Sequence, residues 1–151
     1  MNRAAAITGV VAAAGIAVVA GVHALHKTDS SFSLQKDNAG VCRPSDPDGI
    51  TAGWKNKVKW VVRNVDCPPQ YVSLRNFKHP IGGGQYDPPE TIFETPQVDG
   101  GPIPTAGTET LSAKVDKFVV WPKDFKYEIW LGESAGSLEQ RRDPDIELWP
   151  F

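Results

Sequence analysis

The chain contains 151 residues, which is enough for one compact domain and a short additional segment. It carries 16 Lys and Arg residues against 18 Asp and Glu residues, a net charge of −2, with both signs interspersed along the sequence. Because the sequence has neither a basic stripe nor an acidic tail, it argues against a nucleic-acid-binding protein.

The N-terminal 27 residues differ in composition from the rest of the chain. Residues 4–25 contain no charged side chain; they follow Arg3 and precede His26 and Lys27. In a helix with a rise of about 1.5 Å per residue, a run of this length would cross a hydrocarbon core of roughly 30 Å. The sequence therefore predicts one N-terminal transmembrane or signal helix over residues 1–27.

Two interpretations of this helix remain open. As a signal peptide, it offers a basic start, an apolar stretch and small residues at Ala20 and Ala24 where a peptidase could cut. As a retained anchor, it presents Gly9, Ala13 and Gly15, which would let a helix of another membrane subunit approach closely. The basic N-terminal flank favours an N-terminus inside and a domain on the periplasmic or extracellular side of the membrane.

The next segment, residues 28–40, is polar with little periodicity, which predicts a linker to a domain over residues 41–151. Both cysteines of the chain, Cys42 and Cys67, lie in this domain. In an exported domain an even number of cysteines favours a disulfide bond, which here would close a loop of about 25 residues and contribute about 3 kcal/mol. The alternative is two buried free thiols.

Short segments of alternating character follow, separated by Pro and Gly. Residues 57–64 place Val58, Trp60 and Val62 on one face, the pattern of a half-buried strand, and residues 71–77 repeat it with Val72 and Leu74 inward. Further strands are expected at residues 110–115, 117–121, 126–131 and 145–149. With 14 Gly, 13 Pro and no amphipathic helix pattern after residue 27, the sequence predicts an all-β, two-sheet sandwich.

Two further segments are candidate partner contacts. Residues 78–90 predict a long loop containing Gly82, Gly83 and Gly84; no Gly-Lys-Ser/Thr follows, so we expect a flexible tip where a partner could dock rather than a phosphate-binding loop. At the C-terminus, Trp149 and Phe151 flank a proline. An end this apolar is costly in water, so we expect it to be buried against its own domain or a partner.

The order of these features resembles the cupredoxin fold. The fragments that carry the resemblance are V-K-W-V-V-R-N at 58–64, Y-V-S-L at 71–74, F-K-Y-E-I at 125–129 and D-P-D-I-E-L at 143–148. The similarity covers residues 48–150 and implies a Greek-key sandwich.

The copper chemistry of that family does not carry over. A blue-copper site needs two imidazoles and a thiolate, usually with a weak axial thioether. Cys, His and Met are absent from Phe125 to the C-terminus, Met1 is the only methionine, and His79 is the only histidine of the predicted domain. Cys67 with His79 would supply only two ligands. We therefore expect no metal or other cofactor, and no catalytic motif indicates an enzyme.

These observations favour a noncatalytic accessory subunit, anchored in the membrane by its N-terminal helix and packed on a larger membrane complex, such as a respiratory or photosynthetic one. The alternative is a secreted or periplasmic module, released by signal cleavage, whose loops at 82–89 and 98–107 hold a small ligand or a sugar. Of the five tryptophans, Trp60 is expected in the core, and exposed ones would mark a contact surface.

Overall fold

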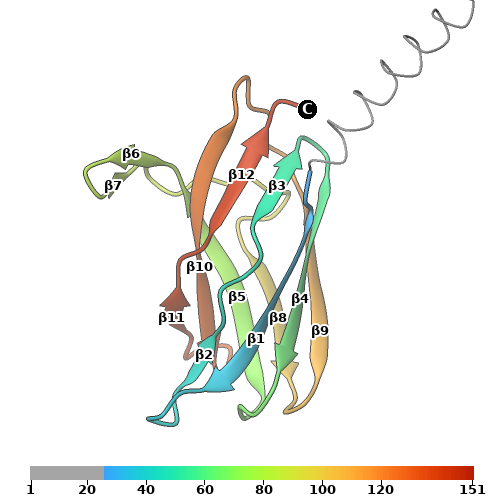
Figure 1. Ribbon diagram of the computed structural model, residues 1–151, viewed down its shortest axis with the longest axis vertical. Coiled ribbons are helices and arrows are strands. Elements are labelled where there is room, and N and C mark those ends of the chain that lie inside the picture. The colour runs from blue at the N-terminus through green and yellow to red at the C-terminus, as the bar shows by residue number, and fades with distance from the viewer. Residues whose placement is uncertain (1–25) are drawn as a thin grey trace, which may run out of the picture.

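A computed structural model describes residues 26–151 and shows an all-β fold (Figure 1). Most of the expected N-terminal helix, with Gly9, Ala13 and Gly15, lies outside these residues. Between residues 26 and 151, no helix is long and apolar enough to cross a membrane.

Two sheets pack against each other in this domain. In strand order, the first sheet contains β2 (Cys42–Pro44), β1 (Asp29–Lys36), β4 (Lys57–Asn64) and β9 (Thr108–Lys114). The second contains β3 (Ile50–Gly53), β12 (Asp145–Trp149), β10 (Lys123–Gly132), β5 (Gln70–Lys78) and β8 (Val98–Ile103), with β11 (Glu139–Arg142) paired to β10. A small hairpin, β6 (Pro80–Gly82) and β7 (Gln85–Tyr86), projects from the side of the sandwich (Figure 1).

The core lies between the two sheets and is rich in aromatic side chains. Trp60 on β4 is fully buried, as expected, and its indole Nε1 donates a hydrogen bond of 3.2 Å to the hydroxyl of Tyr127 on β10. Phe93 packs edge-on against Trp60, and Phe77 stacks on Tyr127. Burial raises the pKa of the Tyr127 hydroxyl far above its usual value. These contacts join the two sheets, because Trp60 and Tyr127 come from opposite ones.

The strands with the clearest alternation form where the sequence predicts them. β4 spans residues 57–64 with Val58, Trp60 and Val62 buried, and β12 spans 145–149. β5, β9 and β10 overlap their predicted segments and are longer or shifted by a few residues. The segment 117–121 is different: it forms no strand, although Val119 in its middle is buried.

The prediction of a linker over residues 28–40 was wrong. Most of this segment is β1, which lies inside the first sheet, parallel to β4 and antiparallel to β2. Phe32 and Leu34 alternate with serines and point into the core. The alternating pattern is hard to recognise because the segment contains only two large apolar residues. The segment forms a strand because it pairs with β2 and β4. The domain therefore begins before residue 41.

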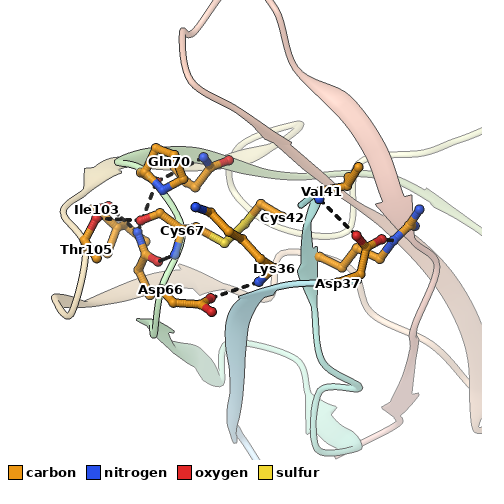
Figure 2. The surroundings of a disulfide bond; sticks show 12 residues. Lys36, Asp37, Val41, Cys42, Asp66, Cys67, Gln70, Ile103 and Thr105 are labelled. Carbon is orange, nitrogen blue, oxygen red and sulfur yellow. Dashed lines mark hydrogen bonds and ion pairs between the residues drawn. A yellow bond between two sulfur atoms is a disulfide. The ribbon is translucent and has the colours of Figure 1, made fainter. Parts of the chain in front are cut away.

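The predicted disulfide between Cys42 and Cys67 is present, with a Cα–Cα distance of 5.8 Å (Figure 2). It links β2 to the loop after β4 at one end of the sandwich, which we call the disulfide end. The Asn64 side chain supports it from the core, accepting a hydrogen bond from the Cys67 N–H (2.9 Å) and donating to the Ile103 carbonyl (3.0 Å). Thr105 donates to the Cys67 carbonyl. Covalent and polar contacts thus hold this end together.

Candidate functional site

Exposed apolar side chains gather at the other end of the sandwich. Five of the seven large hydrophobic residues that are exposed among the described ones lie there; they are Trp54 (46% exposed), Phe118 (57%), Val120 (71%), Trp121 (78%) and Phe151 (61%). We call these five residues the apolar end surface. The other two, Val61 and Ile81, lie separately on β4 and β6. Since scattered exposed hydrophobics are ordinary but clustered ones are not, this surface is the main candidate for a contact site.

The turn between β3 and β4 presents Trp54. The Gly53 N–H donates to the Asn56 side-chain oxygen (2.8 Å), and the Asn56 N–H donates back to the Gly53 carbonyl (3.1 Å). Lys55 takes a left-handed conformation (φ 67°), and its ammonium lies 4.3 Å from the centre of the Trp54 ring. The Lys55 N–H donates a hydrogen bond to the Val115 carbonyl, and the Val115 N–H donates one to the Asn56 carbonyl. These two bonds fix the turn against the β9–β10 connection.

The β9–β10 connection carries Phe118, Val120 and Trp121. Its backbone is attached to the body of the domain by a bridge between Val115 and Phe93. Val119 points inward and is buried, so its neighbours Phe118 and Val120 point outward. The Phe118 ring meets Trp54 edge-on, with 5.9 Å between ring centres. In this segment only Val119 is buried, while Phe118, Val120 and Trp121 are exposed.

A shallow hollow runs beside this connection. Its lining comprises His79, Lys117, Phe118, Val119, Val120, Trp121, Pro122 and Lys123. Lys117 forms an ion pair of 2.9 Å with Glu90. The apolar end surface is thus bordered by basic side chains rather than being uniformly hydrophobic.

The C-terminus and the first described residues meet at this same end (Figure 1). Trp149 pairs with Gly53 across the parallel strands β12 and β3, and a side chain at Gly53 would collide with the Phe151 backbone at 2.5 Å. The His26 ring lies edge-on to Trp149, 6.4 Å between centres. His26 therefore belongs to the folded domain, and the expectation that His79 is its only histidine was wrong.

The expected burial of the C-terminus is only partly met within this chain. Trp149 is half-buried, whereas Phe151 is exposed. Gly82, Gly83 and Gly84 lie apart from these residues at the tip of the β6–β7 hairpin, all three with positive φ and with no atom within 4 Å of an added Cβ. The structure therefore brings Trp149 and Phe151 to the apolar end surface but not the three glycines.

A polar network on the outer face of the second sheet was not expected from the sequence. Glu128 accepts hydrogen bonds from Asn76 (2.7 Å) and Trp130 (2.9 Å) and pairs with Lys78 (3.3 Å). Burial alone would raise the pKa of Glu128, but these three donors outweigh burial and lower it. Arg75 lies over the Trp130 ring at 4.9 Å. This network holds β5 against β10 and covers part of Trp130, which is half-buried.

Two carboxyl groups face each other nearer the apolar end. Asp124 on β10 pairs in register with Glu147 on β12. Burial, followed by the hydrogen bond and the negative charge of Asp124, raises the pKa of Glu147, while a hydrogen bond from Trp149 acts in the opposite sense. The two carboxyl groups are far apart in the sequence and meet only because β10 and β12 are paired.

No group of three or more His, Cys, Asp or Glu side chains suited to a metal ion occurs among residues 26–151. The sulfur of Cys67, considered above as a ligand together with His79, is bonded to Cys42. No protein-family model matches the chain, and no curated protein matches it significantly.

Proposed function

We propose that this chain is a noncatalytic, membrane-anchored interaction domain: an accessory subunit held on the periplasmic or extracellular side and packed on a larger membrane complex. The observation that carries the proposal is the position of the apolar end surface. Trp54, Phe118, Val120, Trp121 and Phe151 lie at the end where the chain arrives from the uncharged run of residues 4–25.

An exposed cluster of this composition is typical of a contact surface. Trp and Tyr dominate binding hot spots because they bury a large area with little loss of side-chain entropy. Here the cluster is preorganised: Trp54 is held on a hydrogen-bonded turn, and Phe118 is held beside it by the buried Val119. Little conformational entropy would be lost when a partner covers it.

We infer a cupredoxin-like Greek-key arrangement for the sandwich. Its support is the two-sheet topology: the chain passes from one sheet to the other between β2 and β3, β3 and β4, β4 and β5, β8 and β9, and β9 and β10. Repeated crossings between two packed sheets are typical of Greek-key sandwiches, although each sheet here also contains one parallel pair, β1 with β4 and β3 with β12. The fragments that resemble the family map onto β4, β5, β10 and β12, which supply half of the buried hydrophobic residues among those described.

The alternative, a released ligand-binding module, receives less support from the geometry. Residues 98–103 form strand β8 rather than a loop. A hollow beside them is lined by Tyr71, Arg75 and Asp99, but by no residue of 82–89. This hollow therefore gives no support to a ligand held by both loops.

Gentle detergent extraction from native membranes, followed by pull-down and mass spectrometry, tests the proposal. We expect an intact N-terminal peptide and stoichiometric membrane-protein partners. Because the apolar end surface determines how the domain lies at the membrane, the F118S/W121S variant should weaken the association with those partners. I81S, which changes an exposed side chain on the β6–β7 hairpin, should leave that association unchanged. A cleaved N-terminus with no copurifying protein would overturn the proposal in favour of the released module.

A further inference from the structure

We propose that the apolar end surface lies in the interfacial layer of a lipid bilayer, so that the sandwich stands upright with its disulfide end farthest from the membrane. This inference rests on the membrane anchorage in the proposed function and specifies what its apolar end contacts.

The first argument is the length of chain available between membrane and domain. Lys27, two positions beyond the uncharged run, is already bound to β3: its N–H donates to the Thr51 hydroxyl (2.7 Å), and its carbonyl accepts from the Thr51 N–H (3.0 Å). The next carbonyl, of Thr28, accepts from the Lys59 N–H. Two extended residues span at most about 7 Å. An anchor ending at residue 25 would therefore hold this end of the domain against the bilayer.

The second argument is the position of the side chains relative to this attachment. His26 packs on Trp149, and Gly53, next to Trp54, lies against both His26 and the Phe151 backbone. Trp54 in turn contacts Phe118. The apolar end surface thus begins at the point where the chain arrives and extends from there across the end of the sandwich.

The third argument is the chemistry of the surface. Trp is enriched at the membrane–water interface, where its ring is buried among headgroups and its N–H stays hydrated. Trp121 is the most exposed large hydrophobic side chain among the described residues, and Phe118 and Val120 beside it are purely apolar. Lys55 lies over Trp54, and lysines at such positions can extend toward anionic headgroups. Tryptophan, other apolar side chains and lysine are residue types found together at membrane interfaces, whereas lysine is depleted from protein interfaces.

Depth-dependent fluorescence quenching tests this orientation. The full chain with W54F, W130F and W149F keeps Trp121 as its exposed reporter and Trp60 as a buried internal standard. It is reconstituted into phosphatidylcholine–phosphatidylglycerol vesicles containing phosphatidylcholine brominated near the headgroup. We expect bromines to quench Trp121 strongly, and acrylamide to quench it less in vesicles than in the detergent-solubilised chain.

A matched control places the reporter at the disulfide end. Ala39, exposed in the β1–β2 turn, is changed to Trp in a chain whose other exposed reporters, including Trp121, are Phe. We expect no quenching of this reporter by brominated lipid. Equal quenching at both ends would overturn the upright orientation.

The remaining outcomes separate this inference from the proposed function. If the chain floats with the vesicles in a density gradient but its Trp121 is not quenched, the proposed bilayer contact is wrong, while membrane anchorage stands. Failure to float would overturn anchorage and the bilayer contact together. Protection of Trp121 in native membranes but not in lipid vesicles would show that a partner protein, not lipid, covers the surface.

Discussion

At the disulfide end, a covalent bond and the buried Asn64 side chain satisfy the groups that the loops bring together, and no large hydrophobic side chain of the described residues is exposed there. At the opposite end, hydrogen bonds between Gly53 and Asn56 hold the turn that carries Trp54, and Trp54 meets Phe118 edge-on, but both rings are exposed. The two ends differ in their apolar side chains, because only the second end leaves a cluster of large ones exposed. This difference indicates that one end stabilises the domain and the other makes contact with something outside it.

The largest effect is expected from removing the disulfide. The C42A/C67A variant should lose about 3 kcal/mol of unfolding free energy, because the unfolded chain would regain the freedom of a loop of about 25 residues. Urea denaturation of the oxidised wild-type chain and the variant measures this difference. An unchanged midpoint would show that this end does not depend on its covalent bond.

A smaller loss is expected at Asn64. Its side chain bonds the Cys67 N–H and the Pro68 and Ile103 carbonyls from a fully buried position, so N64A should cost about 1–3 kcal/mol. The control is N56A in the turn beside Trp54, where only one part-buried backbone N–H, that of Gly53, loses its partner, so the cost should lie at the low end of this range, at about 1 kcal/mol. Equal losses in thermal melts of the two variants would contradict the difference between the ends.

Lowering the pH should change the stability contributions of carboxyl groups at the two ends in opposite directions. A raised pKa means that Glu147 contributes stability below its unfolded pKa of about 4.3 and loses that contribution as pH rises through its folded pKa. E147Q should therefore raise the melting temperature at neutral pH and change it little at pH 3. At the disulfide end, hydrogen bonds from Arg43 and the Val41 N–H lower the pKa of Asp37, so its contribution is lost as pH falls through the folded value. A neutral-pH melt of E147Q no higher than that of the wild-type chain would show that repulsion from Asp124 is negligible.

The smallest effect on stability is expected at the apolar end surface. The V120S/W121S variant removes two side chains that are mostly exposed, so its unfolding free energy should stay within about 0.5 kcal/mol per substitution of the wild-type value. Its contact with membranes or partners should nevertheless weaken. A large loss of stability in denaturant melts would show that these residues pack within the domain, and the surface would lose its argument for an external contact.

Much of the fold could be predicted because its central strands alternate cleanly. Val58, Trp60 and Val62 define β4 without reference to any other segment. The pair Cys42 and Cys67 likewise follows from an even cysteine count in a domain with an export-like start. Predictions of this kind depend on local pattern or composition.

The errors arose where tertiary contacts decide the structure. β1 has only Phe32 and Leu34 as large apolar residues, and it is a strand because β4 and β2 flank it. Residues 117–121 are apolar after Lys117, which suggests a strand, yet they form none, and Phe118, Val120 and Trp121 are exposed. Only part of the candidate surface could be predicted. The apolar C-terminus is visible in the sequence, but its proximity to Trp54 and His26 depends on the parallel pairing of β3 with β12.

Hydroxyl-radical footprinting in native membranes tests most directly whether the apolar end surface is covered in its working environment. The oxidation rates of Trp54 and Trp121 are measured in native membranes and again in the purified full chain. The purified chain is kept in the lowest detergent concentration at which it stays in solution, and Ile81 is the exposed reference. The account predicts strong protection of both tryptophans in native membranes, relieved in the isolated chain, and an unchanged rate at Ile81. Equal oxidation of Trp54 and Trp121 in both states would contradict a covered surface.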